Sequence, residues 1–583
     1  PRERDRGLPG RDPAALPRIA AASVRARMGQ YQFEGKDRGR LGRLRRRGVD
    51  VNEQRDRPPA VFYIGPRRMT LARWPDHGAV TSTETLDPGP VLDVGGTASW
   101  KDFWSRGGRF RIADTRPTRW SEPNRAWVNG VFGHAADWSV NRVDSVSAGG
   151  DEIRLAYGEA RGIGADPLRP PRFFFENVFE ELDQPGEYYV DGERGLLFFL
   201  PTESGDAWRE FARMAWSEDP LIEIEGANHV LIKDLRIGGT RGDAVVIRGA
   251  RDVVIENVHI HSSVGDGVVV RDSREVRVSG LVAEDIGGRG MLLGGGDEKA
   301  LHPSGHAVVA SRFVNCGWWD RAGRAAVELV GLGHVIRDCE DAGLPQMAIE
   351  AKGNDFRIEG CWFHDTCRDF SDTGAIYFDL GESPQRRGTL IRGNLFQNIG
   401  VGSDAASGGV CLDRGSMGVK VVDNIFHRVG EGKDGGAVSI RGGAHVLVEG
   451  NTFIDCPLPL RLEFWWATGG GAEFAQVREG WRELLSAEGT MSHRQRYPEL
   501  QRFFEENRVR PDTNTFKNNH IANLRRGLVV EEGISVVGGP DERLQRSANR
   551  IEQRIPGVVF DERGRPVVPG WRPWRTAQID PKN

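Results

Sequence analysis

A repeat of 22 to 33 residues runs from Leu221 to Phe453 and constrains the fold more than any other feature. Each repeat places a marker residue between two short apolar runs, and a third apolar run follows about ten residues later. The markers are Asp234, Asn257, Gly280, Ser311, Cys339, Cys361, Asn394, Asn424 and Asn451. Three short strands in a turn of 22 or 23 residues are typical of a right-handed parallel β-helix.

The physical reason is that one coil cannot bury its apolar face, whereas stacked coils share a continuous core. A sandwich or propeller would instead show antiparallel alternation and two-residue hairpin signals, which are scarce here. We therefore predict an all-β chain. It would contain a right-handed parallel β-helix, a β-sandwich-like insertion domain and a short helical excursion.

Changes in charge and in the pattern of apolar residues along the chain suggest three parts. Residues 1–58 form a basic arm, whose first 50 residues carry 14 Lys/Arg against 6 Asp/Glu. The basic run Arg40–Arg47 would suit the binding of a polyanion, but the favoured interpretation is a solvated, partly helical arm packed on the body of the protein. Residues 59–210 alternate apolar and polar residues around turns, which indicates a separate antiparallel β-rich domain. Residues 211–583 hold the β-helix, with an apolar helical spacing at about 470–509.

Composition excludes several functional classes. The 79 basic and 83 acidic residues nearly balance, so nucleic acid is not indicated as a partner. No apolar run approaches the roughly 18–20 residues of a membrane helix. Cys-x-x-Cys spacing, a P-loop, a G-x-S-x-G motif and a placed dinucleotide fingerprint are all missing, so we predict neither a metal nor a cofactor. The expected location is secreted or periplasmic, although this chain shows no signal peptide.

Several repeats are longer than a bare coil because they carry insertions next to the third apolar run. Insertions on one side of a solenoid usually mark its binding face. We therefore expect a walled groove along that side. The inserted segments are Gly294–Ser304, Asn315–Gly323, His364–Asp372, Asp379–Gly388 and Asn398–Gly409.

Charged residues gather on this face when the third runs are placed in register. Side chains two residues apart share a face, and neighbouring coils lie about 4.7–4.9 Å apart. One predicted outward row contains Tyr377, Cys411, Ser439 and Arg461, and Glu328 and Glu350 extend it. The next contains Asp379, Asp413, Arg441 and Glu463, and Asp372 enters from the turn before its strand.

Paired carboxylates on a rigid groove suit glycoside hydrolysis, with one as acid/base and the other as nucleophile or base for water. Asp372 and Asp413 are the candidate pair. His364, Arg414 and Arg441 would tune their charge. Aromatic faces stack on sugar rings, and candidates for this role are Tyr377, Trp318, Trp319 and Trp465.

Two other interpretations stay open. Lys352 and Arg441 would suit the base of a polysaccharide lyase acting on a uronic-acid polymer. The protein could also be a non-catalytic glycan-binding or surface protein that keeps the fold, and the face of a solenoid is often charged for solubility alone. A polysaccharide or oligosaccharide is the expected partner in the enzymatic cases, and the oligomeric state is left open.

Several long segments resemble the β-helix proteins of glycoside hydrolase family 141. They are Trp318–Leu329, Gly343–Phe378, Gln385–Phe396 and Gly408–Gly418, and upstream Phe62–Pro75 and Glu176–Pro201 resemble that family's insertion domain. The resemblance covers roughly Leu16 to the C-terminus.

The resemblance implies a glycosidase acting on α-L-fucoside or xylan-type linkages through two aspartates on neighbouring coils. By motif these match Asp372, in Asp-Thr-Gly-Ala-Ile-Tyr, and Asp413, in Val-Cys-Leu-Asp. Asp413 is expected to act as nucleophile or base and Asp372 as acid/base. Arg414 stands where relatives often carry a second acid, which would suit an anionic substrate.

Overall fold

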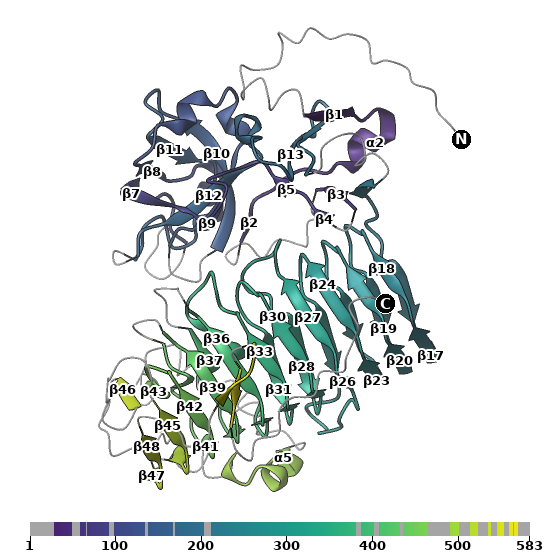
Figure 1. Cartoon of the computed structure of the whole chain (residues 1–583), viewed down its shortest axis with the longest axis vertical. Coiled ribbons are helices and arrows are strands. Elements are labelled where there is room, and N and C mark those ends of the chain that lie inside the picture. The colour runs from purple at the N-terminus through teal and green to yellow at the C-terminus, as the bar shows by residue number, and fades with distance from the viewer. Residues whose placement is uncertain are drawn as a thin grey trace. The chain divides into compact units, whose positions relative to one another are not determined.

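The computed structural model of the chain divides into two compact units, which are described separately (Figure 1). Unit 1 spans Pro1–Trp216 and unit 2 spans Ser217–Asn583. The structure describes residues 28–48, 59–65, 67–92, 98–133, 138–166, 169–202, 211–379, 386–401, 407–431, 435–463, 490–500, 513–522, 534–537, 545–552, 559–563 and 565–568.

Unit 1 consists of strands and a few short helices. The strands are β1 (Gly29–Gln32), β2 (Arg47–Gly48), β3 (Val61–Ile64), β4 (Arg67–Arg68), β5 (Thr70–Leu71), β6 (Arg73–Trp74), β7 (Val80–Asp87), β8 (Arg109–Ile112), β9 (Trp127–Val131), β10 (Trp138–Val146), β11 (Glu152–Leu155), β12 (Arg172–Glu176), β13 (Glu187–Asp191), β14 (Leu196–Phe199) and β15 (Ala212–Ala215). The helices are α2 (Gly35–Arg40), α3 (Trp100–Ser105) and three 3-10 helices, η2 (Arg116–Arg119), η3 (Pro123–Arg125) and η4 (Phe179–Glu181).

The largest sheet of unit 1 closes on itself. Its antiparallel order β11-β8-β7-β12-β9-β10 returns to β11, because β10 also pairs with β11. The ring encloses Phe110, Phe173 and Phe175, which are fully buried. The predicted antiparallel β structure is therefore present, but as a closed ring where a sandwich would keep two separate sheets.

The predicted N-terminal arm contributes strands to unit 1. Within its described residues, β1 pairs with β14 and β2 pairs with β10. The helix α2 buries none of its residues, as expected for a solvated segment. The arm is thus partly built into the β structure rather than lying apart from it.

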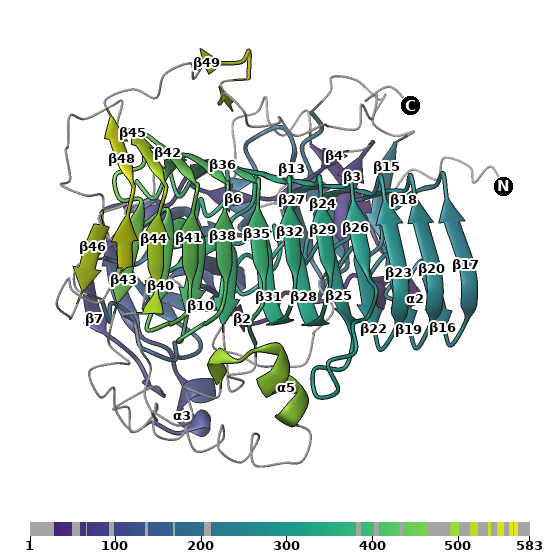
Figure 2. The same cartoon turned by 90° about the horizontal axis from the view of Figure 1, so that it is seen from below.

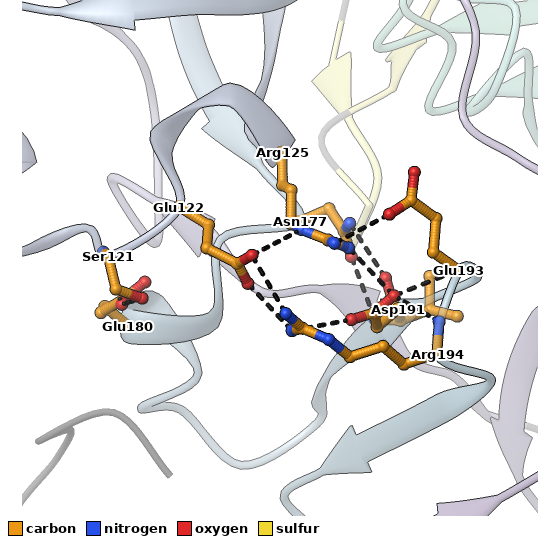
Figure 3. Close-up of polar contacts among 9 residues, drawn as sticks. Ser121, Glu122, Arg125, Asn177, Glu180, Asp191, Glu193 and Arg194 are labelled. Carbon is orange, nitrogen blue, oxygen red and sulfur yellow. Dashed lines mark hydrogen bonds and ion pairs between the residues drawn. The ribbon is translucent and has the colours of Figure 1, made fainter. Parts of the chain in front are cut away.

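A network of ion pairs ties η3 to the β13–β14 hairpin (Figure 3). Arg125 contacts Asp191 and Glu193, each at 2.9 Å. Arg194 contacts Glu122 at 3.1 Å and Asp191 at 3.2 Å. Each of these carboxylates therefore already meets an arginine, and the cluster serves to hold the hairpin.

Unit 2 is a stack of coils whose strands form three parallel sheets of eleven strands each. Sheet 1 contains β16 (Ile222–Glu225), β19 (Val245–Arg248), β22 (Val268–Arg271), β25 (Met291–Gly295), β28 (Val327–Leu332), β31 (Ile349–Asn354), β34 (Thr373–Asp379), β37 (Ser407–Asp413), β40 (Val438–Arg441), β43 (Leu460–Glu463) and β46 (Ile534–Val537).

Sheets 2 and 3 complete each coil, and Figure 2 shows the strands of sheet 2 side by side in order. Sheet 2 contains β17 (Asn228–Lys233), β20 (Arg251–Glu256), β23 (Arg274–Ser279), β26 (Ala307–Val309), β29 (Val335–Arg337), β32 (Arg357–Glu359), β35 (Leu390–Arg392), β38 (Lys420–Val422), β41 (Leu447–Glu449), β44 (Thr515–Lys517) and β47 (Gln545–Ser547). Sheet 3 contains β18 (Arg236–Gly238), β21 (His259–His261), β24 (Val282–Ile286), β27 (Arg312–Cys316), β30 (Glu340–Ala342), β33 (Trp362–His364), β36 (Leu395–Ile399), β39 (Ile425–Val429), β42 (Thr452–Ile454), β45 (His520–Ala522) and β48 (Arg550–Glu552). A separate hairpin pairs β49 (Val559–Phe560) with β50 (Pro566–Val567).

The three predicted runs of each repeat are these three sheets: the run before the marker is in sheet 2, the run after it in sheet 3, and the third run in sheet 1. The marker register needs one correction. Gly280 aligns with Ala310, because Ser279 pairs with Val309, so Leu281 is the true partner of Ser311. Asp234, Asn257 and Gly280 thus lie one residue before the corner. The early coils carry Leu235, Val258 and Leu281 at the corner itself, where later coils carry Ser, Cys or Asn, so matching small residues drew the alignment one residue early.

Asparagine side chains form a ladder at the corner between sheets 2 and 3. The Asn394 amide donates to Asn424 at 2.9 Å, and the Asn424 amide donates to Asn451 at 3.0 Å. Asn451 and Asn519 continue the ladder at 3.1 Å. These amides are buried, so the ladder satisfies polar groups that water cannot reach.

Replacing Asn424 by Ala should destabilise unit 2. The change leaves the Asn394 backbone N–H and side-chain amide without their shared acceptor, and each buried orphan costs roughly 1–3 kcal/mol. We expect a loss of about 3 kcal/mol, measured as a lower urea midpoint. Asn228→Ala is the matched control, because Asn228 is exposed on β17 of sheet 2 and, like Asn424, is not among the residues with a left-handed backbone conformation. Equal midpoints for the two variants would contradict the ladder's role.

The predicted helical excursion follows β43 and is described only in part. Residues 464–489 and 501–512 lie outside the described residues, and between them α5 spans Thr490–Arg496. His493 meets the Glu298 carbonyl at 2.8 Å, and Arg496 meets Asp355 at 2.6 Å. This end of the excursion is therefore held against loops between sheets 1 and 2. Among the helices that the structure describes, none is long and apolar enough to cross a membrane.

Candidate functional site

The register of sheet 1 places the predicted rows on neighbouring strands. Cα pairing joins each residue of the first row to the next along β28, β31, β34, β37, β40 and β43. The row is Glu328, Glu350, Tyr377, Cys411, Ser439 and Arg461. In the second row Asp379 pairs with Asp413, and Arg441 pairs with Glu463. Asp372 directly precedes β34, in a left-handed conformation (φ 60°).

Asp413 ends β37 and is held from two sides. The Tyr377 hydroxyl donates to its Oδ2 at 2.7 Å, and the Arg414 backbone N–H donates to its Oδ1 at 2.8 Å. Burial, together with the negative charge of Asp413, raises the pKa of Tyr377, so the phenol stays protonated and remains a donor. The side chain of Asp413 is 14% exposed. Its orientation is therefore fixed while one edge stays accessible.

Arg441 joins the two predicted catalytic aspartates. Its Nη1 lies 2.5 Å from Asp372 Oδ1 and 3.6 Å from Asp413 Oδ2. The Asp372 side chain is 40% exposed, far more than that of Asp413. The two carboxylates thus approach one guanidinium from neighbouring coils, and Asp372 is the more accessible of the two.

The charge of Arg441 is secured by its surroundings. Burial alone would lower the pKa of the guanidinium, but the groups around it raise the pKa overall. Those groups are Cys411, Asp372, Asp413 and Glu463. Glu463 lies 3.6 Å from Arg441 and 2.9 Å from Arg461, so a second arginine shares this acid.

Glycines lie close to Asp372 in β34 and in the neighbouring strand β37. Gly374, two residues after Asp372, pairs with Gly408. A Cβ atom on Gly408 would lie 2.2 Å from the Gly436 carbonyl oxygen, so no side chain fits there. Neighbouring coils therefore stack closely here, and both glycines are buried between them.

A second charged network continues along the first row. Lys352 Nζ lies 2.8 Å from Glu350 and 3.1 Å from Glu328. Arg289 contacts Glu328 and, at 3.0 Å, Asp266. Burial raises the pKa of Glu350. Burial also opposes the charge of Glu328, but Arg289 and Lys352 lower its pKa overall, so the pKa values of these two glutamates shift in opposite directions.

Some predicted residues lie elsewhere. His364 belongs to β33 in sheet 3, where it meets Glu340 at 3.2 Å and Asp365 at 2.8 Å, so the prediction that it tunes the aspartates is wrong. Trp318 and Trp319 lie in the turn between β27 and β28, two coils before β34. Trp465 lies outside the described residues.

Of three further charged residues at this face, Arg414 was predicted from the sequence, and Asp266 and Arg289 were not. Arg414 reaches Asp379 at 3.9 Å, at the edge of the second row. Asp266 and Arg289 were missed, because they sit in turns before the strands and not in the apolar runs. Their spacing of one 23-residue coil was the available signal. Among the described residues, no group of three or more His, Cys, Asp or Glu side chains could hold a metal ion.

Comparison with known proteins bears on the fold. A family model described as "Right handed beta helix region" matches residues 210–331. Together with the parallel strand order, it establishes that unit 2 is a right-handed β-helix. No curated protein matches the sequence.

Solved structures give only distant likenesses. A "Glycoside hydrolase" is 13% identical, with 69% of this chain and 76% of that chain covered and a TM-score of 0.47. A mannuronic acid specific polysaccharide family 6 lyase from human gut microbiota is 15% identical, with 54% and 66% covered and a TM-score of 0.27. The surface adhesin PfbA of Streptococcus pneumoniae is 13% identical, with 42% and 71% covered and a TM-score of 0.30. At these scores the likenesses carry no argument about function.

Proposed function

We propose that the protein is a glycoside hydrolase that cleaves a polysaccharide or oligosaccharide with Asp372 and Asp413. The observation that carries the proposal is the meeting of these two carboxylates at Arg441 on a rigid sheet. Glycoside hydrolysis requires two carboxyl groups that flank one bond. The proposal includes secretion or a periplasmic location, where such substrates occur.

The surroundings of the two aspartates support different roles for them. Asp413 is fixed by two donors, which suits a nucleophile or a base that activates water. Asp372 is the more exposed and sits in the turn before β34, where it can take a proton from solvent once Arg441 moves away and pass it to the leaving oxygen as the acid. Arg441 would leave Asp372 when the substrate's oxygen takes that place, and would stay beside Asp413.

The linkage follows from the resemblance to glycoside hydrolase family 141, which suggests α-L-fucosides or xylan-type bonds. The rest of the first row would hold neighbouring sugar units. Glu328, Glu350 and Lys352 supply acceptors and a donor there. Asp379, Arg414 and Glu463 would do the same beside the second row.

A polysaccharide lyase is the second candidate, favoured by the half-buried Lys352 one coil before Tyr377. A lyase base must be neutral to take a proton. Burial lowers the pKa of Lys352, but Glu350 and Glu328 raise it above its usual value overall, so the ammonium form is favoured. This argues for the hydrolase.

The test is product release from plant, algal and bacterial polysaccharides and from aryl glycosides. New reducing ends without ultraviolet absorbance are expected from a hydrolase. Ultraviolet-absorbing unsaturated ends would establish the lyase instead. Binding without any product would show a non-catalytic glycan-binding protein.

Tyr377→Phe should reduce turnover while leaving the fold intact. The ring still fills its place, but Asp413 loses one of its two fixed donors. We expect kcat to fall about tenfold or more, with KM changed little, because the lost contact orients a reacting group. Tyr497→Phe is the control, since that hydroxyl meets Asn354 away from the aspartates. A Tyr377→Phe enzyme with wild-type kcat would show that this hydrogen bond does not serve catalysis.

A further inference from the structure

Helix α3 of unit 1 displays tryptophan at its surface. Trp100 and Trp104 are four residues apart and so share one side of the helix. Trp100 is 56% exposed, whereas Phe103 between them is fully buried. Ser99 and Asp102 form a capping box that fixes the helix start. The helix therefore uses Phe103 as its anchor and leaves the indoles outside the core.

The support beneath this surface is rigid. The Gly158 backbone N–H donates to the Phe103 carbonyl at 2.8 Å. A Cβ atom on Gly158 would lie 2.8 Å from the Phe103 ring, so only glycine allows this packing. The next residue back, Tyr157, meets the Trp104 ring edge-on with centroids 5.4 Å apart. Trp100, Trp104 and Tyr157 together form the surface that we call the aromatic platform.

The polar groups at the ring edges of the aromatic platform are available for a ligand. Within the described parts of the chain, the indole N–H groups of Trp100 and Trp104 and the hydroxyl of Tyr157 have no hydrogen-bond partner. Lys101 and Asp102 flank the indoles and are exposed. The platform thus combines the exposed ring of Trp100 and the partly exposed rings of Trp104 and Tyr157 with donors and acceptors at their edges. Arg142 lies over the Tyr157 ring, 5.9 Å from its centroid, which leaves the two indoles as the stacking faces.

We propose that the aromatic platform is a second glycan-binding site, separate from the aspartates of unit 2. Sugar rings present C–H faces that stack on aromatic rings and hydroxyls that bond to their polar edges. A stable protein partner would need roughly 20–30 residues on each side, which three side chains around one short helix do not supply. The inference shares only the class of ligand with the proposed function, so the two can fail separately.

Affinity electrophoresis of the full chain in gels containing xylan, laminarin or fucoidan tests the site. The Asp413→Asn variant serves as parent so that the gel is not digested. We expect at least one of these glycans to retard the parent. Adding Trp100→Ala should weaken the apparent dissociation constant tenfold or more, and Trp100→Phe should retain most of the binding.

Tyr31→Ala is the matched control, because Tyr31 is also 56% exposed in unit 1 but lies on β1. It should leave the retardation unchanged. Equal retardation with and without Trp100→Ala would overturn the proposal, as would a parent that none of the three glycans retards. The proposal would also be overturned if the protein formed a dimer that Trp100→Ala dissociates while glycan binding persists. Hydrolysis of aryl glycosides by Trp100→Ala alone should equal wild type, so loss of turnover and loss of the platform are read separately.

Discussion

Asp413→Asn and Asp372→Asn should each lower hydrolysis by at least about a thousandfold, because each removes one of the two carboxyl groups that the reaction requires. The amide keeps the shape of the side chain but has one oxygen where the carboxylate of Asp413 uses two, so only one of its two donors, the Tyr377 hydroxyl or the Arg414 backbone N–H, keeps an oxygen to bond. The measurement is initial rate on the best substrate of the panel.

Asp423→Asn is the matched control for these variants. Asp423 lies ten residues after Asp413 at the corner between sheets 2 and 3, and it pairs with Arg392 at 3.3 Å on the surface. It should keep wild-type activity. Activity that survives in both Asp372→Asn and Asp413→Asn would move the chemistry to other residues of sheet 1.

Asp341→Leu should stabilise unit 2. Asp341 sits inside the β-helix, in register between Phe313 and Phe363, and neither carboxyl oxygen has a hydrogen-bond partner among the described residues. Burial raises its pKa well above the usual value, and Cys339 and Glu340 add to the shift. An apolar side chain of similar size removes an unpaired polar group, which is worth about 3 kcal/mol.

The raised pKa of Asp341 determines the direction in which the free energy of unfolding changes with pH. The folded state holds the Asp341 proton more tightly than the unfolded state, whose pKa is near 3.8. The free energy of unfolding therefore falls as pH rises above that value, by up to about 1.4 kcal/mol per pH unit, until the folded-state pKa is passed. Thermal unfolding from pH 4 to pH 8 should show wild type losing stability relative to Asp341→Leu. A constant difference between the two proteins would contradict the buried, protonated carboxyl.

Much of unit 2 could be predicted from its sequence because the β-helix repeats one local rule in every coil. The third runs put Tyr377 beside Cys411 and Asp379 beside Asp413, and the register confirms both pairs. The buried cysteines Cys339 and Cys361 also occupy corner positions as expected. The periodicity of the repeats specifies which side chains share a face, and this was enough to predict the two rows of sheet 1.

The predictions that the structure corrects concern geometry that the spacing of residues in the sequence does not encode. Apolar residues occupy the corner itself in the early coils, so matching small residues placed the first markers one residue early. The ring in unit 1 depends on one pairing, β10 with β11, that alternation cannot distinguish from two facing sheets. His364 was assigned to the wrong face because its loop leads into β34 while its own strand lies in sheet 3. Residues in turns, such as Arg289, enter the charged rows only after the coils are stacked.

The most direct test of the central claim is hydrolysis in water enriched in oxygen-18. The account predicts that wild-type protein releases product with one heavy oxygen at each new reducing end, as measured by mass spectrometry. Asp413→Asn should release none above background. Product without heavy oxygen, carrying an unsaturated end, would contradict the account, because the bond would then have been broken by elimination and not by water.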